Sequence, residues 1–592
     1  MTARLDSRRP LGEALGGWVA AGVLTEADAM VAASLADLAG ITPDTDQSVL
    51  LALALAVRAP RSGHVAVDLA GVRDQVLAEI EQIDPDAVET AVALAWPTDP
   101  VAWLRRIEES LLCAGEGSPL VVDLGLVYLR RFHFHETRVG EGVRALAAGA
   151  APTSGRLDVV SAALGLDGGQ RAAVERCLSR RLGVLTGGPG TGKTRTVAAL
   201  LAVLLDGSPD LRIALAAPTG KAAARMGESL ADSVRLLAAS GDAGLVDIAG
   251  RIGAVTPSTI HRLLGVRPGG AGFRHSAERR LPHQVLIIDE ASMVSLPLMD
   301  AVLDALTDGA RLVLVGDGGQ LASVDAGSVL GDIAGAGGAV GECVAELTES
   351  RRFPSQSRIG RLAAAIRAGD GAAATAVLGE PVDDAADGVR VQLVTTVGPV
   401  AEEVGRHARL LGDAARRGDA RDAVDALDEL RVLCAHRRGR AGVSHWTRLA
   451  EDMITLGGHS TSGMYPGRPV IVTRNDPARG LFNGDVGVVV RTADGVRVAF
   501  AAEGEPRLIA PSHLDAVETV HAMTIHKSQG SEFDHVVVVL PSADSRLATR
   551  ELLYTAVTRA RRSVTLVGAA DTVAAAIDRS AARTTGLVRR LS

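Results

Sequence analysis

The 592-residue sequence predicts an α/β protein whose sheets are mainly parallel and doubly wound. Apolar segments at residues 184–185, 212–217 and 285–288 have the character of buried strands. Stretches with helical spacing of apolar residues lie between them, and strands that alternate with helices in this way indicate a parallel sheet. A second strand-rich region begins at Val432. The chain is therefore expected to hold more than one such unit, and its length allows three or four domains.

Composition points to a globular protein, with 47% hydrophobic and 22% charged residues. The longest apolar run, Val49 to Val57, is too short to span a bilayer, and the N-terminus lacks the basic-then-apolar pattern of a signal peptide. The four cysteines are scattered without the paired spacing of a metal site, which fits a reducing compartment. These features predict a soluble, cytoplasmic protein.

Charge divides the chain into two unequal parts. Residues 1–150 carry 12 arginines, no lysine and 21 acidic residues, whereas basic and acidic groups nearly balance in the remainder. Phosphate contacts need positive charge, so any nucleic acid should bind the later part. Residues 1–150, with helical apolar spacing at 11–38 and 48–58, are expected to form a mainly helical domain that packs on itself or on another protein. The best linker candidate is 145–157.

A glycine-rich loop follows the strand at 184–185 and opens an amphipathic helix. Its pattern, Gly-x-x-x-x-Gly-Lys-Thr, is meaningful in this strand–loop–helix context. The glycines let backbone N–H groups face phosphate oxygens, Lys193 can reach the β- and γ-phosphates, and the Thr194 hydroxyl can ligate Mg²⁺. The segment therefore predicts ATP and Mg²⁺ as cofactors, with contacts from Gly187, Gly188, Pro189, Gly190, Thr191, Gly192, Lys193, Thr194 and Arg195.

Lysine usage singles out three positions. The chain has 62 basic residues, of which only Lys193, Lys221 and Lys527 are lysines. Lys193 stands where a compact ammonium is needed and a planar guanidinium fits poorly. Lys221 and Lys527 become candidates for special positions, with chance placement in an arginine-rich composition as the alternative.

Two further strands end in polar residues that suit nucleotide hydrolysis. Asp289 and Glu290 follow the strand at 285–288: Asp289 can hold Mg²⁺, and Glu290 can orient or deprotonate the attacking water. Gln320 follows the strand at 311–316 and could sense the γ-phosphate. Arg559, in the second strand-rich region, is a candidate finger for transition-state charge. Gln170, 23 residues before Lys193, could read an adenine edge, with an ordinary surface glutamine as the alternative.

Several polar helix starts are candidates for contacts with a nucleic-acid backbone. They occur at Pro218-Thr219-Gly220-Lys221 and at Thr259-Ile260-His261, and each could instead be only a helix cap. A similar polar segment runs from Thr524 to Glu532 before another strand. The residues expected to contact the nucleic acid are Pro218, Thr219, Lys221, His261, Thr524 and His526.

Taken in order, these segments resemble the motif series of superfamily 1 DNA helicases over residues 165–570. Residues 166–170, 347–353 and 480–487 resemble the RecD branch, and Ser62–Val65 and Leu126–Arg131 extend that resemblance into the N-terminal 150 residues. The resemblance is to the RecD family, the α subunits of the RecBCD (exonuclease V) complex. One departure is Gly318-Gly319, where the family usually has bulkier or acidic residues, which leaves the local loop geometry open.

The resemblance implies an ATP-dependent 5′→3′ helicase subunit that processes double-strand DNA ends for recombinational repair. It implies an N-terminal partner-docking domain (1–150), two RecA-like lobes (158–355 and 356–592) and an SH3-like β insertion (465–515). RecB-like and RecC-like subunits and single-stranded DNA would be its partners. The residues it assigns to catalysis are Lys193, Asp289, Glu290, Gln320, Arg352 and Arg559, with Gly530 and Glu532 as further nucleotide contacts.

Two other functions remain open. A stand-alone RecD-like helicase typically carries a longer N-terminal region with helix-hairpin-helix repeats, whereas here that region is short and acidic. An ATP-dependent switch without unwinding activity would need no second lobe with a Thr524–Glu532 segment and Arg559. No separate acidic cluster with a lysine lies outside the motor, so nuclease activity is expected only from a partner.

Overall fold

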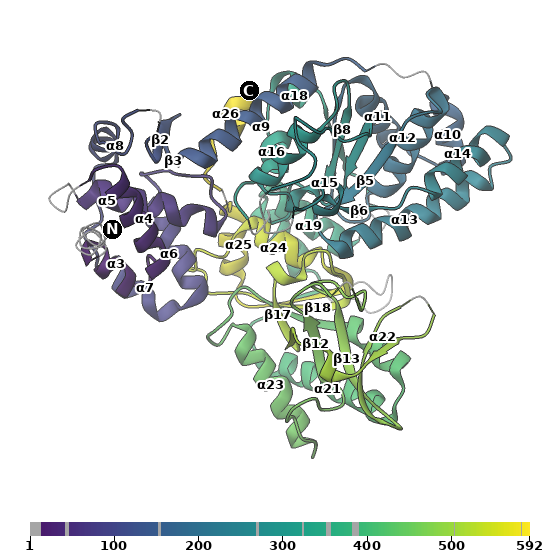
Figure 1. The fold of residues 1–592 in the computed structure, drawn as a ribbon. Coiled ribbons are helices and arrows are strands. Elements are labelled where there is room, and N and C mark those ends of the chain that lie inside the picture. The colour runs from purple at the N-terminus through teal and green to yellow at the C-terminus, as the bar shows by residue number, and fades with distance from the viewer. Residues whose placement is uncertain are drawn as a thin grey trace.

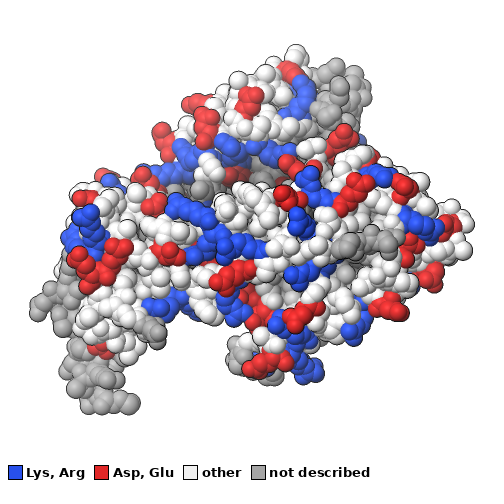
Figure 2. All heavy atoms as spheres, turned by 90° about the horizontal axis from the view of Figure 1, so that it is seen from above, with Lys and Arg blue, Asp and Glu red and all other residues white. Residues whose placement is uncertain are grey.

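The computed structural model describes residues 13–41, 47–115, 117–151, 155–267, 272–321, 325–350, 357–381, 390–476, 478–502, 504–581 and 583–592. Figure 1 shows a helical N-terminal region (purple), a first α/β lobe (teal) and a second lobe (green to yellow). No helix in these ranges is long and apolar enough to cross a membrane. Figure 2 views the molecule from the side of α9 (Arg130–Ala148) and α26 (Leu587–Leu591), where basic and acidic side chains are intermixed.

The N-terminal region is mainly helical, as the sequence predicts. Thr25 and Asp28 form a capping box that starts α4, and a core of small and aliphatic side chains joins the helices of the region. A three-stranded antiparallel sheet in the order β1-β3-β2 closes the region. Its elements are α3 (Gly16–Ala20), α4 (Glu26–Leu38), α5 (Gln47–Arg58), β1 (Ala66–Val67), α6 (Val72–Ile83), α7 (Val88–Val92), α8 (Pro100–Glu108), β2 (Leu120–Asp123), β3 (Leu126–Leu129) and α9.

The first lobe is a parallel six-stranded sheet in the order β6-β5-β7-β8-β4-β9. Alternate residues of its strands enter two different cores, so helices cover both faces, as a doubly wound sheet requires. Its strands are β4 (Leu182–Gly187), β5 (Ile213–Ala217), β6 (Ser258–Thr259), β7 (Val285–Ile288), β8 (Arg311–Gly316) and β9 (Val344–Leu347). Its helices are α10 (Leu157–Leu164), α11 (Gly168–Ser179), α12 (Lys193–Gly207), α13 (Gly220–Ala238), α14 (Ala243–Gly253), α15 (Ile260–Leu264), α16 (Leu296–Ala305), α17 (Val329–Ala334) and α18 (Gly338–Gly341).

The second lobe is a parallel five-stranded sheet in the order β10-β19-β18-β11-β17. Its strands are β10 (Arg390–Val394), β11 (Leu430–Cys434), β17 (Ala522–Thr524), β18 (Phe533–Val539) and β19 (Ala560–Val567). Its helices are α19 (Arg358–Ala368), α20 (Gly371–Gly379), α21 (Val397–Arg417), α22 (Ala420–Glu429), α23 (Val443–Leu456), α24 (Arg550–Val557) and α25 (Ala570–Asp578).

A separate antiparallel sheet is inserted in sequence between α23 and β17. Its strands are β12 (Pro469–Val472), β13 (Val486–Thr492), β14 (Gly495–Phe500), β15 (Arg507–Ile509) and β16 (Val517–Thr519). The order β15-β14-β13-β12-β16 leaves β15 and β16 as its two edges. The predicted antiparallel strands are thus present, while SH3-like closure of the sheet stays a prediction.

The C-terminal segment departs from the predicted organisation. Residues 583–592 leave the second lobe and return to the N-terminal region, where the Thr584 carbonyl accepts hydrogen bonds from Val65 N (3.0 Å) and Ala66 N (3.3 Å). Leu587 and Leu591 of α26 enter a core that combines α9 with the first lobe. The C-terminal segment therefore packs with residues 65–66 and α9 against the first lobe, which the limits 1–150 and 356–592 do not anticipate.

Candidate functional site

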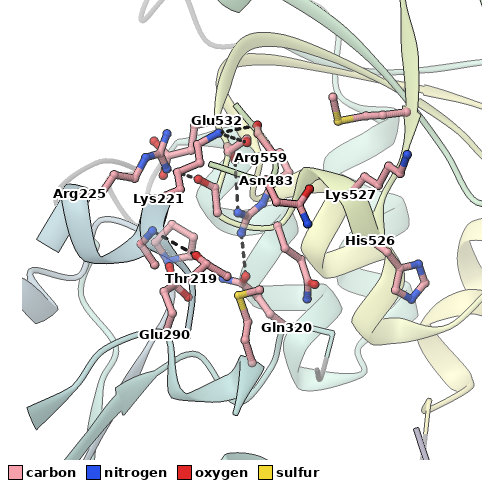
Figure 3. Close-up of a pocket in the computed structure, with 18 of the residues that line it drawn as sticks. Thr219, Lys221, Arg225, Glu290, Gln320, Asn483, His526, Lys527, Glu532 and Arg559 are labelled. Atoms are coloured by element: carbon pink, nitrogen blue, oxygen red, sulfur yellow. Dashed lines mark hydrogen bonds between the residues drawn. The ribbon is translucent and has the colours of Figure 1, made fainter. Parts of the chain in front are cut away.

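A cavity of about 1180 Å³ lies between the two lobes and the antiparallel insertion. The first lobe contributes the glycine-rich loop and the ends of β7 and β8, the second lobe contributes residues 524–532, and the insertion contributes residues around 471–473 and 483–484. Lys193, Lys221 and Lys527 all line it. The lysines that composition set apart from 59 arginines therefore meet at one place. Figure 3 shows Lys221 and Lys527 among its lining residues.

The glycine-rich loop joins β4 to α12 with little room for side chains. Gly190 and Gly192 have φ of +77° and +81°, which favours glycine. A β-carbon at Gly187 would lie 2.8 Å from the Leu347 carbonyl oxygen. Lys193 Nζ donates to the carbonyl oxygens of Gly187 (2.7 Å) and Gly188 (3.0 Å). The ammonium thus lies inside the loop, where a phosphate group would be cradled between it and the α12 N-terminus.

The carboxylates after β7 lie in a strained, partly buried segment. Glu290 has φ of +51°, a left-handed conformation that is uncommon for a residue with a side chain and is typical of functional sites. Asp289 Oδ1 accepts a hydrogen bond from Glu290 N at 2.8 Å. Burial and the Glu290 charge raise the pKa of Asp289 to about 6, with Lys193 opposing them. A cation beside Asp289 would stabilise the ionised carboxylate and lower this pKa.

The donor set fits Mg²⁺ held jointly by protein and nucleotide. In the described ranges, no group of three or more His, Cys, Asp or Glu side chains could hold a metal ion by itself. Asp289 and Thr194 both line the cavity beside Lys193. Mg²⁺ commonly binds one or two protein oxygens and completes its shell with waters and phosphate oxygens, which matches this arrangement.

A hydrogen-bond network crosses from the first lobe to the second. Gln320 Nε2 donates to Asp317 Oδ2 (2.7 Å), and its Oε1 accepts from Arg559 Nη2 (2.8 Å). Tyr554 donates its hydroxyl to the same Asp317 oxygen at 3.2 Å. Arg559 is 4% exposed, and burial lowers its pKa although Glu290 and other acidic groups oppose this. The predicted finger and γ-phosphate sensor are therefore in direct contact across the lobe boundary.

The Gly318-Gly319 departure has a simple local geometry. Asp317 Oδ1 accepts from Gly319 N (3.1 Å), and the Asp317 carbonyl accepts from Gln320 N (3.3 Å). A β-carbon at Gly319 would lie 3.4 Å from Tyr554 Cε1. The two glycines thus lie in a tight turn that presents Gln320 to Arg559.

Gln170 supports the glycine-rich loop from behind. It is 1% exposed, its Oε1 accepts from Asp167 N (3.3 Å), and its Nε2 donates to Thr191 O (3.1 Å). A β-carbon at Gly192 would lie 2.3 Å from that Nε2. Because Gln170 is buried, the surface-glutamine alternative is wrong, while its contact with adenine stays a prediction.

Four of the six residues expected to contact nucleic acid line the cavity: Thr219, Lys221, Thr524 and His526. The Thr219 hydroxyl caps α13 by accepting from Ala222 N at 3.2 Å. Burial, with Arg583 and Arg437 nearby, lowers the pKa of His526 to about 4, so its ring is neutral at pH 7. Pro218 and His261 are not among the lining residues, and His261 is exposed beside Phe273.

Lys221 lines the cavity, and its ammonium donates to Gly484 O (3.2 Å) and Ser531 Oγ (3.0 Å). Its contact with a nucleic-acid phosphate stays a prediction. Gly530 and Glu532 also line the cavity, and their contact with a nucleotide stays a prediction. Arg352 lies outside the described residues.

Arg225, Arg437 and Asn483 are among the further lining residues that sequence reasoning missed. Arg225 stands one helical turn after Lys221, and Arg437 opens an arginine-rich loop after β11. Asn483 belongs to the segment 480–487 already singled out. Helical spacing and the position after a buried strand could have indicated the first two.

Comparisons with known proteins agree with this geometry. Family profiles match an AAA domain at residues 170–326, a UvrD-like helicase C-terminal domain at 519–567 and the RecBCD enzyme subunit RecD N-terminal domain at 20–128. RecBCD enzyme subunit RecD of Mycolicibacterium smegmatis is 48% identical, covering 96% of this chain and 98% of that protein. The Mycobacterium tuberculosis counterpart is 44% identical over 96% and 95%. The ATP-dependent RecD2 DNA helicase of Deinococcus radiodurans is 32% identical over 85% of this chain but only 62% of its own length.

Proposed function

The chain belongs to the RecBCD enzyme subunit RecD family, and from that premise we propose that it is the 5′→3′ helicase and translocase subunit of a RecBCD-type complex. The observation that carries the proposal is the hydrogen bond from Arg559 to Gln320, which in turn donates to Asp317, beside the glycine-rich loop. A nucleotide bound there lies at the joint of two lobes, so its hydrolysis can change their relative position.

The residues divide the work of ATP hydrolysis as follows. The glycine-rich loop binds the phosphates, with Lys193 exchanging its carbonyl partners for phosphate oxygens. Glu290 orients the attacking water and takes its proton, while Arg559 places positive charge where negative charge develops in the transition state. Thr194 and Asp289 would hold Mg²⁺, which neutralises charge on the β- and γ-phosphates.

Gln320 connects this chemistry to movement. Its carboxamide joins Asp317 of the first lobe to Arg559 of the second, and Leu321 beside it accepts a hydrogen bond from Gln529 Nε2 at 2.6 Å. Loss of the γ-phosphate would remove a partner of this network and let the lobes separate. Repeated closure and opening would move single-stranded DNA along the cavity past Thr524 and His526.

Sequence similarity supports a complex subunit over a stand-alone helicase. The chain is 48% and 44% identical to the two mycobacterial RecBCD RecD proteins, against 32% for the RecD2 helicase. RecB-like and RecC-like subunits would be its partners, supplying nuclease activity and a path for DNA ends. Co-expression with those subunits from the same host should yield a stable heterotrimer.

Strand displacement tests the polarity. The full chain with ATP and Mg²⁺ should displace a strand from duplexes that carry a 5′ single-stranded tail and not from those with a 3′ tail. Displacement from the 3′ tail alone would refute the proposal. Full activity together with failure to assemble with RecB and RecC would favour the stand-alone alternative.

A further inference from the structure

The N-terminal part of α13, a helix of the first lobe, forms hydrogen bonds with the second lobe and with the insertion. Lys221 Nζ donates to Ser531 Oγ of the second lobe and to Gly484 O of the insertion, and Arg225 donates to the Gly530 carbonyl. The ring of Phe482 lies against Gly220, where a β-carbon would be 2.1 Å from Phe482 Cδ1. The start of α13 is thus a meeting point of the first lobe, the second lobe and the insertion (Figure 3).

Ser531 links Lys221 to Arg559. Its hydroxyl is bound by Lys221, while its carbonyl oxygen accepts from Arg559 Nη1 at 3.3 Å. Arg559 also donates from Nε to Thr555 O (3.1 Å) and from Nη2 to Gln320. Two of the three bonds that orient this guanidinium therefore depend on the 530–531 turn and on Gln320. Lys221 and Arg225 hold that turn from the other lobe.

The surroundings of Lys221 suit a lysine at this position. Burial lowers its pKa to about 8, with Arg225 on the same helix and Arg431 on β11 acting in the same direction. Asp485 of the insertion and Asp428 of α22 oppose them. A compact ammonium fits between a hydroxyl and a carbonyl oxygen, whereas a planar guanidinium would need a wider site. Burying a charge is costly, so this position is not that of an ordinary surface cation.

We propose that Lys221 is a positioning residue for Arg559: it fixes the Gly530–Ser531 turn and the insertion loop at Phe482–Gly484 against the first lobe. The inference rests on the proposed function, since it concerns alignment of the finger during ATP hydrolysis. It makes the insertion part of the catalytic assembly, because the finger is aligned only when the insertion lies against α13.

The test uses the full chain and oligo-dT as single-stranded DNA. Lys221→Met should lower kcat for ATP about 10-fold or more at saturating DNA, the scale of a lost hydrogen bond to a charged group. KM for ATP and Kd for oligo-dT should stay within about 3-fold, because neither ligand is bound by Lys221. Arg235→Met, at an exposed site near the other end of α13, is the matched control and should match the wild type.

Ser531→Ala provides a second, independent variant. It removes the hydroxyl bound by Lys221 and keeps the carbonyl bound by Arg559, so kcat should fall while the double variant is no worse than Lys221→Met alone. In the wild type, kcat should fall as pH rises through about 8, where Lys221 loses its proton. Lys221→Met should lack this fall.

Three results would overturn the proposal. Lys221→Met could keep kcat but weaken oligo-dT binding and reduce its salt dependence by about one ion, which would make Lys221 a phosphate contact. The effects of Lys221→Met and Ser531→Ala could be additive. If Lys221→Met does not fold, an unchanged kcat in Ser531→Ala would by itself overturn the proposal. A wild-type chain without DNA-stimulated ATP turnover would instead refute the proposed function.

Discussion

The ion pair between Arg590 and Glu136 should hold the C-terminal segment in place. Glu136 is fully buried, and its Oε1 accepts from Arg590 Nε at 2.9 Å. Arg590 also pairs with the partly exposed Asp123 at 2.5 Å. Arg590→Met would leave a buried carboxylate without its cation, which typically costs about 3–5 kcal/mol.

The lower end of that range applies, because Glu136 keeps other donors. Its oxygens still accept from the Tyr128 hydroxyl, the Thr585 hydroxyl and Gly586 N, each at 3.0 Å. A cost of about 3 kcal/mol changes the equilibrium between docked and released C-terminal segment about 100-fold.

Hydrogen exchange measures this equilibrium directly. The amides of Val65 and Ala66, which donate to Thr584 O, should exchange about 100-fold faster in Arg590→Met. Arg589→Met is the matched control: it lies on the same helix, is exposed, and donates only to the Leu124 carbonyl among the bonds described. Equal exchange rates in the two variants would refute the reasoning.

Three other predictions concern the site and the N-terminal region. Lys193→Ala and Asp289→Ala should each abolish ATP turnover in a coupled assay, while unchanged far-UV circular dichroism shows that the fold is kept. DNA-stimulated turnover near the wild-type rate in either variant would place the site elsewhere. Arg559→Ala should lower kcat about 10³-fold with ATP affinity nearly unchanged, because its charge acts in the transition state; weaker ATP binding with normal kcat in a nucleotide titration would contradict this. Burial raises the pKa of Glu79, but the His64 hydrogen bond and the Arg58 charge outweigh it and lower the pKa to about 2. Glu79 thus adds about 3 kcal/mol to the free energy of unfolding above pH 4.5, and this contribution is lost as pH falls toward 2. Acid unfolding followed by tryptophan fluorescence should show this pH dependence in the wild type and not in Glu79→Gln. Identical acid transitions in the two proteins would disprove the prediction.

The parts of the site that sequence predicted are those built from consecutive residues. The glycine-rich loop depends on backbone conformations that only glycine adopts easily, and on a lysine at one fixed place after them. Asp289 and Glu290 follow a fully apolar strand, and the carboxyl ends of parallel strands meet at one edge of a sheet. Neighbouring residues therefore carry enough information to place these groups together.

The parts that sequence did not place depend on pairs far apart in the chain. Lys221 was expected to contact a phosphate because it opens a helix after Thr219, and its hydrogen bonds to Gly484 and Ser531 could not be read from the sequence. Gln170 was expected to read an adenine edge, with a surface glutamine as the alternative, and its burial and its hydrogen bond to Thr191 O could not be read from the sequence. A polar side chain forms hydrogen bonds with the acceptors that lie within about 3 Å of it in the folded protein. The spacing of residues near it in the sequence does not indicate which distant segments supply those acceptors.

The sequence by itself determined the α/β class, the alternation of strands and helices, and the nucleotide-binding loop, because backbone conformation and hydrophobic periodicity act over a few residues. The tertiary structure alone decided that Arg559 meets Gln320, that the three lysines share one cavity, and that the last ten residues pack against Glu136 and the first lobe. Such contacts form because the burial of whole faces of helices and sheets brings distant segments of the chain together. A buried charge such as Glu136 is tolerated only because packing brings Arg590 to it across more than 450 residues of chain.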